Sequence, residues 1–120
     1  MRAVWVAIAG AAGALSRYGI GLAIGPQLFP WATLCINISG SFALAFVLTW
    51  GMAGHLSTDA STAIAVGFLG AYTTFSTFSF ETFTMGRTDR TVSAVVYVVV
   101  SVLGGILAAW GGFRLGRALR

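Results

Sequence analysis

Hydroxyl groups and phenylalanine rings alternate in the segment Gly67–Glu81, GFLGAYTTFSTFSFE, which is otherwise apolar. Phe75 and Phe78 are three residues apart, so they share one face of a helix. An aromatic stripe at this spacing is usually packing, but the hydroxyls here are too dense for an ordinary lipid-facing helix. Polar side chains in lipid are costly, and they usually face a cavity, a partner helix or an ion pathway.

The donors in this segment favour a small anion over a proton or a metal cation. Ser76 and Thr77 place hydroxyls between the two phenylalanines. The edge of a phenyl ring is electropositive, so a ring presented edge-on attracts an anion. Each such contact is weak, and a dehydrated anion needs several of them at once. These side chains therefore indicate a small-anion pathway, without naming the anion.

Two other apolar stretches carry polar side chains. TLCINISGSF contains Asn37, whose amide either ties two helices together or points its NH2 group into a pore. Tyr97 and Ser101 are four residues apart and lie on one helix face, where they could extend a line of hydroxyls. Either pattern alone is also typical of ordinary helix packing.

Two charged side chains lie inside apolar stretches as well. Arg17, in GAAGALSRY, could extend to the membrane surface, bind a backbone carbonyl or attract an anion. Glu81 lies near the end of its stretch. We expect it to be an interfacial residue or the partner of an arginine.

The helix that carries the alternating segment is predicted to break near its middle. Gly67 and Gly70, followed by the β-branched Thr73 and Thr74, form a weak helical stretch. A break there would free backbone carbonyl oxygens, and free carbonyls at membrane depth suit a small cation.

These residues must be positioned by membrane-spanning helices. Hydrophobic residues make up 58% of the 120 residues and charged residues only 8%, too few to cover a water-facing surface. Four apolar stretches approach the length of about 20 residues that crosses a bilayer. They are Val4–Ile24, Trp31–Met52, Ala63–Met85 and Thr91–Phe113. The sequence predicts an all-α membrane protein with one four-span domain over residues 1–120; a signal peptide at the first stretch is the less favoured alternative.

The side chains point away from catalysis and from nucleic acid. The sequence has no phosphate-binding glycine loop, no metal-spaced cluster of His or Cys and no nucleophile–base pair. Its basic residues, all arginines, form no stripe interleaved with polar groups. We therefore expect neither an enzyme nor a nucleic-acid partner.

The arginines are distributed almost evenly between the two ends of the predicted bundle. Four lie on the side of the termini, and Arg87, Arg90 and Arg17 lie on the other. The positive-inside rule then gives no firm orientation, so either one topology wins narrowly or the chain inserts both ways. Four short helices hardly enclose a selective path alone, and small residues at four-residue spacing favour close helix packing. A homodimer is the expectation.

Three motifs together resemble one known family. GAAGALSRY, TLCINISGSF and GFLGAYTTFSTFSFE are similar to the motif regions of the Fluc (CrcB-like) fluoride ion channels, and the length and four-span layout match over essentially the whole chain. The resemblance implies an antiparallel, dual-topology homodimer with two pores. It also implies passive fluoride export across the cytoplasmic (inner) membrane.

The resemblance assigns roles by position. Asn37 resembles the pore asparagine that donates its amide to fluoride, and Phe75 and Phe78 resemble the phenylalanines whose ring edges line the path. The other implied roles fall to hydroxyls near the anion path (Ser76, Thr77), a polar track on the fourth helix (Tyr97, Ser101), carbonyls that hold a central structural sodium ion (Gly70, Thr73), and positions of less clear role (Arg17, Glu81).

Three alternatives remain open at this point. A small multidrug-resistance-type transporter also has four spans, but its first span needs a titratable acid, and here that span holds only Arg17 as a charge. A non-transporting assembly subunit would use TTFSTFS as helix–helix packing. Some members of the resembled family are heterodimers of two related chains.

Overall fold

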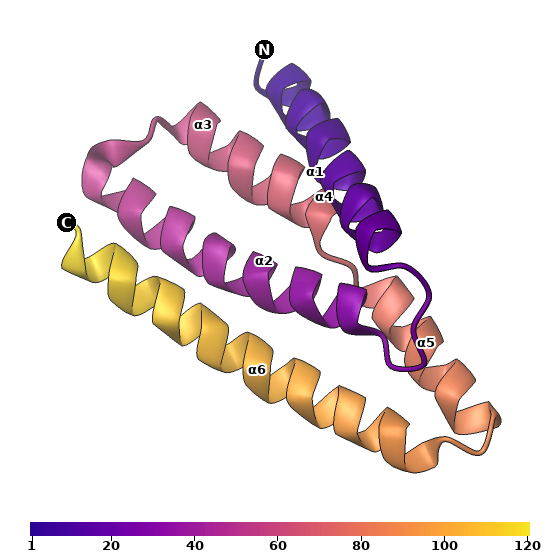
Figure 1. Cartoon of the computed structure of the whole chain (residues 1–120). Helices are drawn as coiled ribbons and strands as arrows, with labels where there is room; N and C mark the ends of the chain where they lie inside the picture. The colour runs from indigo at the N-terminus through magenta and orange to yellow at the C-terminus, as the bar shows by residue number, and fades with distance from the viewer.

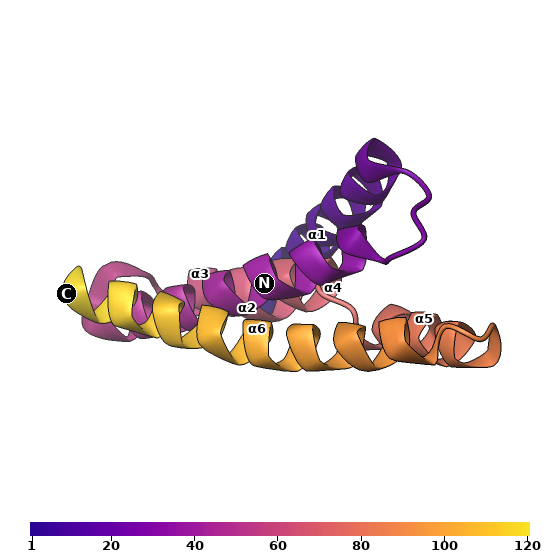
Figure 2. The ribbon, with the colours of Figure 1, turned by 60° about the horizontal axis from the view of Figure 1, so that its bottom comes forward.

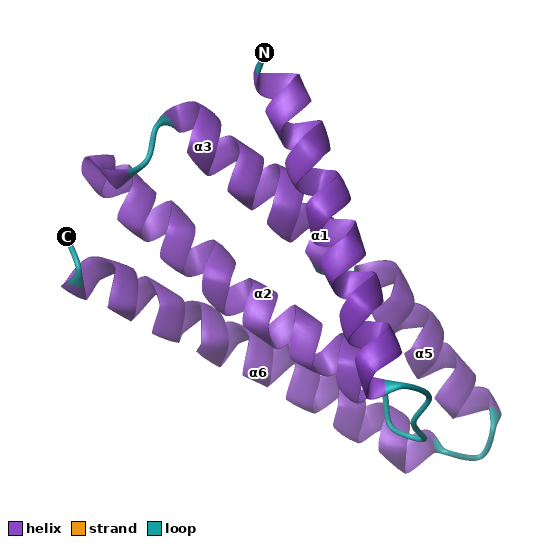
Figure 3. Ribbon diagram, turned by 45° about the horizontal axis from the view of Figure 1, so that its top comes forward, coloured by secondary structure: helices purple, strands orange, loops and turns teal.

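The computed structural model describes residues 1–120, and all of its regular structure is helical (Figure 3). The elements are α1 (Arg2–Ile24), α2 (Trp31–Trp50), the π-helical turn η1 (Gly51–His55), α3 (Thr58–Thr62), the π-helical stretch η2 (Ala63–Leu69), α4 (Gly70–Tyr72), α5 (Phe75–Arg87) and α6 (Thr91–Ala118). Short connections join them, as the sequence suggests.

Four helical runs are long and apolar enough to cross a membrane. They are Arg2–Ile24, Trp31–His55, Thr58–Arg87 and Thr91–Ala118. The third run begins before the predicted start of its span, because Ser57 caps α3 by accepting a hydrogen bond from the N–H of Ala60. The chain is an all-helical, multi-pass membrane protein.

Both termini lie at the end of the bundle that holds the connection between α2 and α3. Arg2 pairs with Asp59 of α3 at 2.6 Å, and the Arg120 guanidinium donates to the Thr49 carbonyl of α2 at 3.2 Å. The opposite end holds the α1–α2 loop and the α5–α6 turn, which are joined where Arg90 donates to the Leu28 carbonyl. Figures 1 and 2 show this antiparallel course, with α1 inclined away from the other helices.

Glycines allow the closest helix contacts. α2 and α6 run side by side (Figure 1), and a Cβ added at Gly112 of α6 would overlap the Phe42 carbonyl of α2. Where α1 crosses η2, a Cβ at Gly13 would overlap the Phe68 carbonyl, and one at Gly67 would lie 2.6 Å from the Val6 carbonyl oxygen. These contacts bring backbones together, as small residues do in membrane helices.

A short extended link separates α4 from α5 within the third helical run (Figures 1 and 2). Thr73 has φ −79° and ψ 157°, and Thr74 has φ −150° and ψ 115°. Gly70 itself is helical, with φ −63° and ψ −35°, so the extended residues are the threonines rather than the glycine. Thr74 then starts α5 as its N-cap, since its Oγ1 accepts from the Thr77 N–H at 3.2 Å.

The interior of the single chain is small. Only 13 of 120 residues are buried, and the main cluster consists of Leu34, Met85, Ala94 and Tyr97. Large apolar side chains on every long helix are exposed, for instance Ile106 at 62%. Burying apolar surface is the main favourable term in folding in water. A chain that leaves this much apolar surface outside needs lipid or another chain to cover it.

Candidate ion site at the link between α4 and α5

The Asn37 side chain holds the extended link with two hydrogen bonds. Its Oδ1 accepts from the Thr74 N–H at 2.8 Å, and its Nδ2 donates to the Thr74 carbonyl at 3.1 Å. An asparagine amide matches the backbone in this way because it carries a donor and an acceptor side by side. Asn37 therefore ties α2 to the link, the first of its two predicted roles. Its NH2 group retains a second N–H.

The link leaves backbone carbonyls without helical donors. In a continuous helix the Thr74 N–H would donate to Gly70, but here it donates to Asn37. The Thr73 carbonyl accepts no backbone hydrogen bond. The Ala71 carbonyl accepts from Arg17 Nε at 3.1 Å, which is one of the three roles predicted for this arginine. The carbonyls of Gly70 and Thr73 are thus the oxygens here that could hold a cation.

A cavity of about 340 Å³ adjoins the link, and we call it the link cavity. Its lining includes polar side chains, two phenylalanine rings and residues of the link: Asn37, Ser41, Gly70, Thr73, Thr74, Phe75, Phe78 and Ser101. The Ser101 hydroxyl is buried and has no hydrogen-bond partner within the chain. A buried hydroxyl without a partner is costly in lipid, so a ligand or water in this cavity would satisfy it. The cavity combines donors, rings and free carbonyls contributed by α2, α4, α5 and α6.

The two phenylalanine rings are neighbours, as their spacing predicts. Their centroids are 5.9 Å apart and their planes are inclined by 46°. Phe78 also contacts Tyr97, with centroids 5.1 Å apart, and this contact fixes its ring in the interior. Phe75 instead is 79% exposed and projects from the chain.

A second cavity, of about 390 Å³, lies on the other side of the link, and we call it the Arg17 cavity. Its polar lining residues are Arg17, Tyr18, Thr33, Thr74, Thr77 and Glu81. Thr74 lines both this cavity and the link cavity. Ser76 is exposed and lines neither, although its hydroxyl lies 3.4 Å from that of Thr74.

Glu81 is held by hydroxyls rather than by an arginine, which corrects one of the two roles expected for it. Thr33 donates to its Oε1 at 2.9 Å and Tyr97 donates to its Oε2 at 2.7 Å. The chain's one ion pair joins Arg2 and Asp59. Tyr97 is fully buried and lines neither cavity, so its hydroxyl acts on Glu81 while that of Ser101 borders the link cavity.

Thr33 and Thr74 also line the site, although the sequence predicts no ion-binding role for either; it marks Thr74 only as part of the weak helical stretch. Thr33 lies four residues before Asn37 and therefore on the same helix face, a signal that was present in the sequence. Thr74 is the first residue of TFSTFS and stands directly before Phe75, where α5 begins, and threonine is a favoured N-cap. The contact that fixes its extended conformation comes from Asn37, which lies 37 residues away in the sequence.

The chain is similar to one known protein family and to several named proteins. Residues 4–113 match the family described as "CrcB-like protein, Camphor Resistance (CrcB)". A protein of Thermus thermophilus named "Fluoride-specific ion channel FluC" is 41% identical, over 98% of this chain and 95% of its own. The protein of the same name from Acidobacterium capsulatum is 40% identical, over 99% and 98%. "Fluoride-specific ion channel FluC 1" of Desulfitobacterium hafniense is 43% identical, over 90% and 96%. Because the family match covers nearly all of the sequence, and relatives align with it at 40% identity or more along nearly their own full length, the chain belongs to the CrcB-like family.

Proposed function

We propose that this protein is a fluoride-selective ion channel that lets fluoride leave the cell passively. The relatives named as fluoride-specific channels support this function, and their names describe ion channels rather than enzymes. One observation carries it from the structure: Asn37, Phe75, Phe78 and the unpartnered hydroxyl of Ser101 line a single cavity.

The pore in this proposal replaces the hydration of fluoride with weak contacts. The second N–H of the Asn37 amide, the Ser101 hydroxyl and the edges of Phe75 and Phe78 supply electropositive groups. Thr77 lines the Arg17 cavity, and the Ser76 hydroxyl lies 3.4 Å from the hydroxyl of Thr74, which also lines that cavity. Both residues therefore belong to the approach to the pore. A set of weak donors suits conduction, because an ion that binds too tightly does not leave.

The proposed channel is an antiparallel homodimer with two pores. A ring as exposed as Phe75 has most of its surroundings outside its own chain, and the small interior leaves apolar surface for a partner. Since each chain offers one link cavity, two chains give two equivalent pores. The nearly even distribution of arginines between the two ends is compatible with insertion in both directions.

The proposal includes a structural sodium ion at the centre of the dimer. The carbonyls of Gly70 and Thr73 fit such an ion because neither accepts a helical hydrogen bond. The Thr74 N–H, which would donate to Gly70 in a continuous helix, donates to Asn37 instead, and no backbone N–H donates to the Thr73 carbonyl. Carbonyl oxygens are ligands that a hard cation accepts. Two carbonyls from each chain would hold the ion. Its positive charge would attract the carbonyl oxygens of both links and so hold the two links together.

Fluoride release from liposomes tests the proposed function. Purified protein is reconstituted into vesicles loaded with potassium fluoride, and a potassium ionophore then permits charge-balanced efflux. We expect rapid fluoride release that depends on both the protein and the ionophore. Release no faster than from protein-free vesicles would contradict the proposal and leave a packing subunit as the alternative.

A proton-coupled transporter of the multidrug-resistance type is the competing function. The charge in the apolar part of α1 is Arg17, which is bonded to a backbone carbonyl and offers no acid for proton exchange. Fluoride release that requires no pH gradient, together with no uptake of a drug cation when one is imposed, would separate the channel from this transporter.

A further inference from the structure

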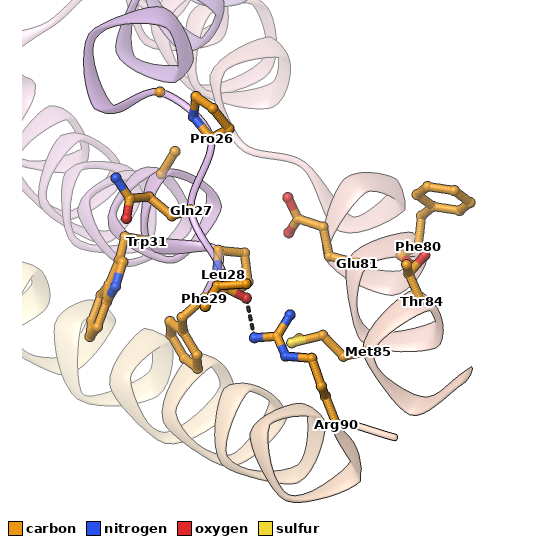
Figure 4. Close-up of a pocket in the computed structure, with 13 residues that line it drawn as sticks. Pro26, Gln27, Leu28, Phe29, Trp31, Phe80, Glu81, Thr84, Met85 and Arg90 are labelled. Atoms are coloured by element: carbon orange, nitrogen blue, oxygen red, sulfur yellow. Dashed lines mark hydrogen bonds between the residues drawn. The ribbon is translucent and has the colours of Figure 1, made fainter. Parts of the chain in front are cut away.

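A third cavity, of about 350 Å³, lies at the end of the bundle where the α1–α2 loop meets α5 and the start of α6. We call it the outer cavity. Its charged lining residues are Glu81 and Arg90, and Gln27 and Thr84 add polar groups. Figure 4 shows Glu81 and Arg90 directed toward this space from two different segments of the chain.

The outer cavity adjoins the Arg17 cavity, which in turn adjoins the link cavity. Glu81 and Ala32 line both the outer cavity and the Arg17 cavity. Thr74 in turn lines both the Arg17 cavity and the link cavity. The shared lining residues place the three cavities next to one another, in an order that runs from the loop end of the bundle to the phenylalanine rings.

Arg90 is a cation at the rim of this series without an acidic partner. Its guanidinium donates to the Leu28 carbonyl and forms no ion pair. A guanidinium has five N–H donors, so this bond leaves most of them available. The other charges of the same turn, Arg87 and Asp89, do not line the cavity.

The opposite wall carries the negative charge of Glu81, whose carboxylate is held in place by hydrogen bonds. Both carboxylate oxygens of Glu81 accept hydroxyl hydrogen bonds, from Thr33 and Tyr97, so the carboxylate is held at the inner end of the cavity. An anion entering from water meets the Arg90 guanidinium first and the carboxylate later. This order attracts the anion at the rim without trapping it, as a conducting path requires.

We propose that the outer cavity is an antechamber that collects small anions and that Arg90 is its attracting cation. The inference rests on the proposed fluoride channel and adds the place where the ion leaves bulk water. A single cation at the mouth of a cleft with low-dielectric walls raises the local concentration of anions and their rate of entering. This effect weakens as salt screens the charge.

The test compares fluoride release at low and high ionic strength for three variants in vesicles of neutral lipid. Arg90→Gln removes the charge, and Arg90→Lys retains it. Arg87→Gln is the matched control, because Arg87 lies three residues away, outside the cavity and over the Phe83 ring. We expect Arg90→Gln to slow release about threefold at low salt, and the difference to vanish near 1 M salt, where the screening length is about 3 Å. Arg90→Lys and Arg87→Gln should match the original protein at both salt concentrations.

Three outcomes would overturn this inference. Arg90→Gln could release fluoride as fast as the original protein at low salt. It could be equally slow at all salt concentrations, which would assign Arg90 only the structural role of holding the loop at Leu28. Arg87→Gln could be slowed as much as Arg90→Gln, which would indicate general surface charge. Each result presupposes fluoride release by the unaltered protein, so failure of the channel function itself is recognised separately.

Discussion

The Asn37 side chain and the Thr74 backbone form the smallest unit on which the site depends. Their two hydrogen bonds hold an extended residue inside a membrane helix, where every backbone group needs a partner. The same contact redirects the Thr74 N–H away from Gly70 and leaves one amide N–H of Asn37 available. One side chain therefore holds the link and, in the proposed channel, offers an N–H donor to the anion.

Replacing Asn37 by leucine, which has a similar shape, should destabilise the protein as well as slow fluoride release. The Thr74 N–H and carbonyl would lose their partners, at a cost of roughly 1–3 kcal/mol for each buried group. We expect a lower apparent melting temperature in detergent, measured by fluorescence-detected gel filtration. Cys35→Ala, at an exposed position of the same helix, should leave that temperature nearly unchanged. An Asn37→Leu protein as stable as the original would show that the two hydrogen bonds do not hold the link.

Substitutions of the phenylalanine rings can distinguish an electrostatic role of the ring edge from a role in packing. Phe75→Ile and Phe78→Ile keep apolar bulk but remove the electropositive ring edge, so each should reduce fluoride release by about tenfold, the equivalent of about 1.4 kcal/mol. The measurement is the initial rate of ionophore-dependent release from vesicles.

Phe83→Ile is the matched control for these ring variants. Phe83 is on the same helix, is 59% exposed and lines none of the three cavities. Its replacement should have little effect on release. If both Phe75→Ile and Phe78→Ile retained the original rate, the rings would serve packing alone.

At the scale of elements, glycine contacts fix how the helices position the site. α6 carries Ser101 and lies against α2, which carries Asn37, and Gly112 permits this approach because no side chain intervenes. The crossing of α1 over η2 depends similarly on Gly13 and Gly67, and it brings Arg17 to the end of α4. The site is therefore assembled by backbone contacts some distance from it.

Gly112→Leu should separate α2 from α6 and abolish folding of the pair. The added side chain would overlap the Phe42 carbonyl, and a backbone cannot move aside as a flexible side chain can. We expect loss of the monodisperse gel-filtration peak. Gly19→Leu is the control, since an added Cβ there meets nothing within 4 Å. Normal gel-filtration behaviour of Gly112→Leu would refute the importance of this contact.

Much of this arrangement is predictable from the sequence, because apolar runs of bilayer length and the turn residues between them mark the four helices. The spacing of Phe75 and Phe78 also predicts their contact. The partners of the polar groups are not predictable in this way. Glu81 is bonded to Thr33, which is 48 residues distant, and a hydroxyl partner leaves no charge pattern that the sequence would reveal. The extended conformation at Thr73 and Thr74 likewise depends on a contact from another helix.

At the scale of the whole molecule, the proposed channel requires a second chain and a cation between the two chains. Removing sodium ions by prolonged exchange into potassium buffer should progressively lower fluoride release, because the carbonyls of Gly70 and Thr73 would lose the cation that they hold in the proposed dimer. Returning sodium should restore release, whereas adding more potassium should not. Full activity after exhaustive sodium removal would contradict the proposed ion at the dimer centre.

The most direct test of the central claim is selectivity measured on one preparation. Vesicles carrying the purified protein are loaded with fluoride and chloride together, and ion-selective electrodes follow the release of both ions after the ionophore is added. We expect rapid loss of fluoride while chloride stays at the level of protein-free vesicles. Equal release of the two anions, or release of neither, would contradict the central claim.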